Sequence, residues 1–144
     1  MEQLRNLREE SNLRQIDIAN ILGIKRSTYT SYEIERDTIP ITHLNKICNY
    51  FNVSIDYVMG LTNKLQYEKT HKEINKLLVK ERIKNLRKSN KLTQSEIAKV
   101  LNISRSTWTG YEYGKYLIPT LLLYELAKRY NCSMDYLLGK IDKY

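Results

Sequence analysis

Residues 93–112 read TQSEIAKVLNISRSTWTGYE, and this stretch decides how the rest of the chain folds. Apolar residues recur in it at the spacing of one helix face, and Asn102 interrupts them where a turn is expected. The positions that would face inward are Ile97, Ala98, Leu101, Thr107, Trp108 and Tyr111. The pattern therefore predicts two short amphipathic helices joined by a tight connection of about three residues.

The same pattern occurs a second time, 79 residues upstream, where residues 15–33 read QIDIANILGIKRSTYTSYE. When residues 1–65 are laid over residues 80–144 without gaps, 25 of the 65 aligned pairs are identical. A gap-free match of this length predicts two copies of one structural unit. We therefore expect one domain at residues 1–61 and another at residues 80–144, joined by a linker at residues 62–79.

Each copy is expected to form five short helices, so the predicted fold class is all-α. In the first copy these helices are expected at residues 2–10, 15–22, 26–34, from Pro40 onward and at 55–59. Gly23, and Asn102 at the aligned place in the second copy, suit the left-handed conformation past a helix end. Proline favours the first turn of a helix, and Ser54 is a good cap for the last one.

The linker, TNKLQYEKTHKEINKLLV, contains neither proline nor glycine. Its residues Leu65, Ile74, Leu77 and Leu78 fit one face of a helix. We expect a helical linker that continues into the first helix of the second copy and fixes the distance between the copies, unlike a flexible tether. The same apolar face could instead pair two chains as a homodimer.

The chain is basic, with a formal net charge of +8. Such a charge suits a nucleic acid or an anionic membrane, although a basic solvated surface without a polyanionic partner fits it equally well. The apolar runs are too short for a transmembrane helix, and a charged segment directly follows Met1, so no signal peptide is expected. Cys48 and Cys132 fall at apolar-patterned positions rather than in a disulfide framework. We expect a cytoplasmic protein without membrane association.

No catalytic constellation stands out in the sequence. His43 and His71 lie in separate segments without a partner nucleophile, and there is no zinc spacing of Cys and His. A glycine-rich phosphate loop is also missing from the sequence. We therefore expect neither an enzyme nor a bound cofactor or metal.

The ordered motifs of each copy are similar to those of the phage-repressor and Cro-like helix-turn-helix family, also called the Xre family. In the second copy the resemblance is carried by Arg87, Leu92-Thr93-Gln94, Ile97-Ala98, Leu101, Ser106-Thr107-Trp108, Tyr111-Glu112, Gly114, Pro119 and Ser133-Met134-Asp135-Tyr136-Leu137-Leu138-Gly139. The resemblance implies two tandem lambda-repressor-like domains. In each of them the third helix would be the recognition helix, lying in the major groove of DNA.

The resemblance also implies which residues contact DNA. Gln15 and Gln94 begin the second helix of each copy, where a side-chain amide can donate to a phosphate. Arg26 and Arg105 lie in the first turn of the recognition helix, and the planar guanidinium matches O6 and N7 of guanine. A phosphate contact or a free surface charge is the alternative role for either arginine. The predicted DNA-binding residues are Gln15, Lys25, Arg26, Ser27, Thr30, Ser31, Gln94, Ser104, Arg105, Ser106, Thr109 and Gly110.

Other recurring residues are expected to support the recognition helix rather than to touch DNA. The resemblance implies salt bridges between the first helix and the end of the recognition helix, formed by Arg8 with Glu33 and by Arg87 with Glu112. Aromatic residues at inward helical spacing favour core packing over stacking on bases. These residues are Tyr29, Tyr32, Trp108 and Tyr111.

The two copies differ in charge and in one turn. Residues 1–65 carry a net charge of 0 and residues 80–144 a net charge of +7. Glu35 occupies the place of Gly114, and glutamate is poor in a left-handed conformation, so we expect the first copy to end its recognition helix differently. Because phosphate neutralisation supplies most of the affinity for DNA, we expect the second copy to bind DNA more strongly.

The sequence thus predicts a sequence-specific regulator of transcription that binds double-stranded DNA, and a repressor in particular. Its two domains could read two half-sites about 34 Å apart, as the halves of a repressor dimer do. The competing interpretation is a protein-interaction or antitoxin-like module, in which the first copy contacts a protein partner.

Overall fold

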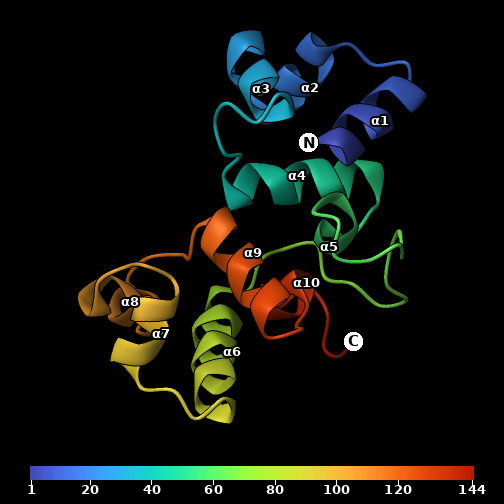
Figure 1. Ribbon diagram of the computed structural model, residues 1–144. Coiled ribbons are helices and arrows are strands. Elements are labelled where there is room, and N and C mark those ends of the chain that lie inside the picture. Colours follow the sequence, from blue (N-terminus) through green and yellow to red (C-terminus); the bar gives the residue numbers. More distant parts are fainter. The chain divides into compact units, whose positions relative to one another are not determined.

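The structure, a computed structural model, describes all 144 residues and contains ten helices and no strand, which confirms the all-α fold (Figure 1). The chain divides into two compact units, residues 1–72 and 73–144, with five helices in each. Unit 1 contains α1 (Glu2–Glu10), α2 (Gln15–Leu22), α3 (Arg26–Glu33), α4 (Ile41–Phe51) and α5 (Ile55–Val58). Unit 2 contains α6 (Lys76–Ser89), α7 (Gln94–Val100), α8 (Arg105–Glu112), α9 (Thr120–Arg129) and α10 (Met134–Leu137).

The core of unit 1 is built from the inward faces of its five helices. Helix α2 packs against α3 and α4, while α1 contacts α3 and α5. The side chains that meet there are almost fully buried, and they include Leu4, Ile18, Tyr29, Leu44, Ile47 and Ile55. Burying each of these side chains stabilises the fold by about 1.5–3 kcal/mol. The α2–α3 pair therefore packs against α1 and α4, and α5 packs against both of those helices.

Unit 2 repeats most of this arrangement. Helix α8 packs against α7 and α6, and α10 packs against α6 and α9. The aligned core residues are Ile83, Ile97, Trp108, Leu123, Leu126 and Met134, each at most 1% exposed. The predicted burial of the aromatic residues of both recognition helices is confirmed, since all four are at most 8% exposed.

The turn inside each helix pair also follows the sequence. Gly23 ends α2 at φ +69°, and Asn102 takes the same left-handed conformation at φ +57°. Glycine adopts this conformation at no steric cost, and asparagine is among the residues that tolerate it best. The turn between α2 and α3 and the turn between α7 and α8 thus have the same conformation, although different residues form them.

The expectation that the first copy ends its recognition helix differently is wrong. Glu35 adopts φ +60°, close to the φ of +76° at Gly114. The backbone hydrogen bonds that follow are also equivalent, since Arg36 N donates to Ser31 O and Lys115 N to Gly110 O, both at 2.9 Å. Backbone hydrogen bonds from Glu35 N to Tyr32 O and from Arg36 N to Ser31 O hold this left-handed turn, although glutamate disfavours it.

The predicted helical linker is wrong for residues 62–75, which form no helix. Two carbonyl groups of this segment instead accept hydrogen bonds from earlier parts of unit 1. Leu65 O accepts a hydrogen bond from Ser54 N at 2.6 Å, and Lys72 O accepts from the side-chain amides of Asn45 and Asn49 at 3.1 and 2.9 Å. These contacts join residues that are distant in sequence, so local helical preference is overridden by tertiary structure.

The end of the linker does behave as predicted. The helix that begins at Lys76 runs without a break into the part of α6 that matches the first helix of the first copy. Asn75 caps this helix, because its side-chain oxygen accepts a hydrogen bond from Leu78 N at 3.1 Å. None of the ten helices has the length and apolar character that crossing a bilayer requires.

Candidate nucleic-acid interface

The recognition helix of unit 1, α3, buries one face and exposes its N-terminal turn. Tyr29 and Tyr32 point into the core, at 0% and 7% exposure. Lys25, Arg26 and Ser27 are all exposed at the start of the helix. Their charges and hydroxyl therefore stand together at the end of the helix where backbone N–H groups attract anions.

The recognition helix of unit 2, α8, exposes the aligned residues Ser104, Arg105 and Ser106. Here the first residue is a helix cap, since Ser104 Oγ accepts a hydrogen bond from Thr107 N at 3.1 Å. The Ser104 hydroxyl also lies 3.1 Å from that of Ser106. Arg105 is thus the one cation of the first turn, whereas α3 begins with Lys25 and Arg26.

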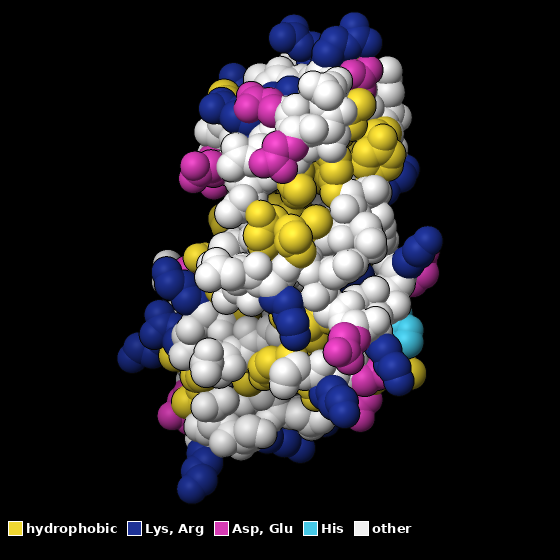
Figure 2. Space-filling view, turned by 90° about the vertical axis from the view of Figure 1, so that its right-hand side faces the viewer, with side chains coloured by type: hydrophobic (Ala, Val, Ile, Leu, Met, Phe, Trp, Pro, Cys, Tyr) yellow, Lys and Arg dark blue, Asp and Glu magenta, His cyan; other side chains and the backbone are white.

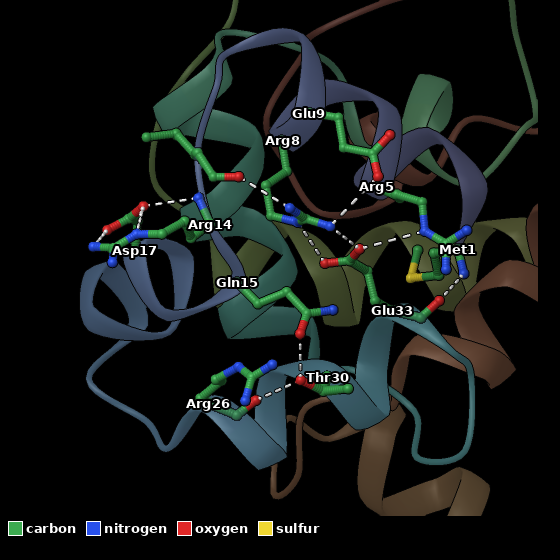
Figure 3. Close-up of polar contacts among 11 residues, drawn as sticks. Met1, Arg5, Arg8, Glu9, Arg14, Gln15, Asp17, Arg26, Thr30 and Glu33 are labelled. Carbon is green, nitrogen blue, oxygen red and sulfur yellow. Dashed lines mark hydrogen bonds and ion pairs between the residues drawn. The ribbon is translucent and has the colours of Figure 1, made fainter.

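A pair of hydrogen bonds ties the first helix of each unit to the end of its recognition helix. In unit 1, Arg8 Nε and Nη2 donate to the two carboxylate oxygens of Glu33 at 2.9 and 2.8 Å (Figure 3). Arg87 and Glu112 repeat these contacts with the same two distances. Both glutamates are 4% exposed. A buried bidentate pair of this kind is specific in geometry, so it fixes the recognition helix against the body of the unit.

Each arginine also holds the turn that precedes the helix pair. Arg8 Nη1 donates to Leu13 O, and Arg87 Nη1 donates to Leu92 O, both at 2.9 Å. One guanidinium therefore connects the first helix, the loop before the second helix and the recognition helix. Lysine has no planar fork of donors and could not make these three contacts at once.

An aromatic residue lies beside each buried glutamate, and neither residue was predicted to have this place. Trp108 Nε1 donates to Glu112 Oε2, and Tyr29 lies beside Glu33 in unit 1, where burial and the carboxylate raise the pKa of the tyrosine hydroxyl. The signal was present in the spacing, because both aromatic residues precede their glutamate by four positions and so share its helix face.

The pKa of each buried glutamate reflects a competition. Burial by itself raises the pKa of Glu112, but hydrogen bonds from Arg87 and Trp108 outweigh it and hold the pKa below the usual value. In unit 1 the pKa of Glu33 is lowered in the same way, since the hydrogen bonds from Arg8 overcome the effect of burial. Both carboxylates are therefore ionised at neutral pH.

The two glutamines at the start of the second helix face the recognition helix. Gln15 Oε1 lies 2.8 Å from the Thr30 hydroxyl, which donates to it (Figure 3). In unit 2 the contact between Thr109 and Gln94 Oε1 is longer, at 3.5 Å. Because the oxygen of Gln15 is engaged by Thr30, its amide NH₂ group is left to donate elsewhere. Thr30 and Thr109 thus act on the glutamines as well as bordering the exposed turn.

Two of the twelve residues predicted to bind DNA lie inside the fold. Ser31 is 1% exposed, and its hydroxyl donates to Thr28 O at 2.7 Å. Gly110 is also buried, and a Cβ atom there would lie 3.0 Å from the Tyr116 ring. Both residues were expected near the bases because they lie one helical turn beyond the start of the recognition helix. That spacing gives the position of a residue along the helix axis but does not say which face of the helix the residue occupies. Both positions face the interior, which corrects their assignment to the DNA-binding set.

The remaining predicted residues are accessible. Six of them, three in each unit, are exposed at the start of the recognition helices, and the two glutamines and two threonines are half-buried behind them. Lys and Arg side chains are scattered among Asp, Glu and uncharged side chains over the face drawn in Figure 2. The distribution of charge on that face alone would not locate a nucleic-acid site.

Comparison with known proteins gives the family. The helix-turn-helix family model matches twice, at residues 4–58 and 83–137. The chain is 39% identical over 62 residues to the HTH-type transcriptional regulator YobD of Bacillus subtilis (strain 168), which covers 43% of this chain and 55% of the relative. It is 32% identical over 74 residues to the HTH-type transcriptional regulator YqaE of the same organism, covering 51% of this chain and 64% of the relative.

A third relative has a different description. The antitoxin PezA of Streptococcus pneumoniae serotype 4 (strain ATCC BAA-334 / TIGR4) is 33% identical over 63 residues, which covers 44% of this chain and 40% of the relative. The chain thus spans about half the length of these curated relatives, and no solved structure matches it.

The two matched segments contain both helix pairs, their exposed first turns and the buried arginine–glutamate pairs, and they cover most of the chain. The chain belongs to the helix-turn-helix family, with two tandem Xre-like copies.

Proposed function

We propose that this chain is a sequence-specific regulator of transcription that binds double-stranded DNA, and that it acts as a repressor. The observation that carries the proposal is the exposed arginine in the first turn of each recognition helix, Arg26 and Arg105. Behind each arginine, a buried salt bridge holds the helix at a fixed angle. A helix that is held in place and carries an exposed guanidinium at its N-terminal turn can place two hydrogen-bond donors against O6 and N7 of guanine in the major groove.

The other exposed residues would position the protein on the backbone rather than read bases. Gln15 and Gln94 are proposed to donate their amides to phosphates, as are the backbone N–H groups at the starts of the two helices. Ser27, Ser106 and Lys25 have side chains that suit either a phosphate or a base edge. The buried residues Ser31 and Gly110 have no part in this proposal.

The two units are proposed to contribute unequally to the affinity for DNA. Unit 2 has the strong positive charge, with a net charge of +7 in residues 80–144 against 0 in residues 1–65. Phosphate neutralisation by Lys and Arg supplies most non-specific affinity and much specific affinity. We therefore assign the larger share of DNA affinity to unit 2.

The decisive experiment is selection of bound DNA from a random duplex library with the intact chain. We expect one enriched site that contains a guanine for each engaged arginine, and the selected sequences would also give the spacing of the half-sites. Affinity for the selected duplex should fall steeply as the salt concentration rises. If no sequence is enriched and no duplex binds at low salt, the proposal is wrong.

A second candidate function is an antitoxin-like interaction with a protein, with unit 1 as the contact. The similarity to antitoxin PezA and the neutral charge of residues 1–65 favour it. In that case residues 1–72 would bind no DNA and the chain would capture a protein partner.

Light scattering is a useful companion measurement, because a 17.1 kDa particle at micromolar concentration would exclude a stable homodimer.

A further inference from the structure

The first helix of unit 2 is longer than its counterpart in unit 1. Helix α6 has 14 residues and α1 has nine. In the gap-free alignment Glu2 corresponds to Glu81, so residues 76–80 are an addition at the start of α6. This added turn carries Lys76 and Lys80, which lie four residues apart and therefore on one face of the helix.

The added turn is firmly attached to the rest of unit 2. Asn75 N donates to Leu138 O at 2.9 Å, and Val79 is 3% exposed. A Cβ atom built at Gly139 would lie 2.7 Å from Asn75 Cβ, which shows how closely the start of α6 approaches the end of α10. The two lysines are thus presented by a fixed helix, as a precise binding site requires.

Lys76 and Lys80 line a small hollow at the end of the recognition helix. Its volume is about 90 Å³, and its lining also includes Lys115, Gly114 and Tyr111. No carboxylate lines the hollow, and none of the three lysines forms an ion pair. Like charges four residues apart on a helix repel each other, so an anion placed between them would relieve this repulsion.

A glycine lies where the side chain of Lys80 meets the loop after α8. A Cβ atom at Gly114 would lie 3.1 Å from Lys80 Cδ, and the residue has a φ of +76°. The aligned place in unit 1 has the opposite charge, because Glu35 occupies it and lies 3.7 Å from the ammonium group of Met1. Asp37 stands where unit 2 has Tyr116. The cationic hollow is therefore a property of unit 2 alone.

We infer that this hollow binds a phosphate of the DNA backbone beside recognition helix α8, and that Lys76, Lys80 and Lys115 are the residues that hold it. The inference rests on the proposed function and extends the DNA contact of unit 2 to the start of its first helix. Pockets for drug-sized ligands measure about 300–1,000 Å³, so a hollow of about 90 Å³ suits a group the size of a phosphate rather than an organic effector.

The test compares two charge-matched variants of the full chain, Lys80→Gln and Lys88→Gln. Lys88 is exposed on the same helix, eight residues from Lys80, and does not line the hollow. Each variant loses one positive charge, so a purely global effect of charge is the same in both. Binding to one selected duplex is measured by fluorescence anisotropy at several salt concentrations, and circular dichroism checks that both variants fold.

We expect Lys80→Gln to reduce the salt slope of log Kobs by up to about 0.9, the value for complete loss of one phosphate contact on duplex DNA. Lys88→Gln should leave the slope unchanged, and Lys76→Gln should repeat the effect of Lys80→Gln. A single neutral methylphosphonate linkage moved along the duplex should then weaken wild-type binding at one position where it does not weaken binding by Lys80→Gln. This lack of a further loss would identify the phosphate in the hollow.

Three outcomes would overturn the inference. If Lys80→Gln and Lys88→Gln change the slope equally, only the total charge matters and the hollow has no special role. If neither changes it while the wild type binds DNA, the hollow faces away from the duplex and the proposed function still stands. If the wild type binds no duplex even at low salt, the inference and the proposed function fail together.

Discussion

Glu112 is a buried carboxylate that depends on one arginine for its charge compensation. Its side chain is 1% exposed and receives two hydrogen bonds from Arg87. Replacing Arg87 by alanine would leave an unpaired buried charge, which costs about 3–5 kcal/mol. We expect the Arg87→Ala variant to lose about that much stability in unit 2, measured by urea denaturation followed by circular dichroism, which reports on both units.

The matched control for this variant is an exposed ion pair in the same chain. Arg14 pairs with Asp17 at 3.1 Å, but the Arg14 side chain is 78% exposed. Arg14→Ala should therefore have little effect on stability, because exposed ion pairs contribute little. If Arg87→Ala were as mild as Arg14→Ala, the buried pair would not hold the recognition helix.

The same carboxylates make stability depend on acid. The pKa values of Glu33 and Glu112 are lowered in the folded chain, while an unfolded glutamate has a pKa of about 4.3. Their stabilising contribution is therefore complete above that value and is lost as the pH falls through the lowered folded pKa. We expect the urea midpoint to drop below about pH 4, and Glu112→Gln should show a smaller drop than the wild type.

Glu35 has a left-handed backbone conformation that is unfavourable for glutamate, whereas Gly114 adopts the same conformation without strain. Glu35 holds a φ of +60°, and a left-handed backbone costs an ordinary residue about 1–2 kcal/mol. We expect Glu35→Gly to stabilise unit 1 by up to about 1 kcal/mol, since glycine also gains freedom in the unfolded chain. Thermal unfolding followed by circular dichroism measures this, and a lower melting temperature would show that the contact of Glu35 with the Met1 ammonium outweighs the strain.

At the scale of single elements, the recognition helices carry the prediction about specificity. A bidentate arginine–guanine contact discriminates against a wrong base by about 1–3 kcal/mol. We expect Arg105→Ala to weaken binding to the selected duplex and to leave binding to a duplex with that guanine replaced almost unchanged. Equal weakening on both duplexes, measured by anisotropy titration, would instead identify Arg105 as a phosphate contact.

The helices themselves were largely predictable, because their signals are local. The bounds of α1 and α2 agree with the expected residues 2–10 and 15–22, since apolar spacing, a cap and a left-handed residue all lie within a few positions of each helix. The faces of residues near the recognition turn were less predictable. Ser31 and Gly110 were expected at the DNA, yet both are buried, because a small side chain gives no signal of its own in an apolar pattern.

The non-helical linker could not have been predicted from local sequence. Residues 62–75 lack proline and glycine, and their composition favours a helix. What prevents one is a set of partners elsewhere, such as Asn45 and Asn49 on α4 and Tyr67, whose hydroxyl donates to Asp56 at 2.7 Å. Only the folded unit brings these groups together.

At the scale of the whole molecule, the prediction concerns the two units tested apart. Each unit is compact by itself, so fragments 1–72 and 73–144 can be compared directly. We expect the second fragment to bind duplex DNA more tightly and with a steeper salt dependence, since it contains the cationic residues of α6 and the loop after α8. Tighter binding by fragment 1–72, in electrophoretic mobility-shift titrations, would contradict the assignment of DNA affinity to unit 2.

The hydrogen bonds that Leu65 O and Lys72 O accept from earlier parts of unit 1 have a consequence for inheritance. The family match of the first copy ends at residue 58, but Ser54, Asn45 and Asn49 find backbone partners beyond that point. Recombination that exchanged the first helix-turn-helix copy with a breakpoint at residue 58 would separate these side chains from their acceptors. The portable module, whether moved by evolution or by protein engineering, therefore extends to Lys72.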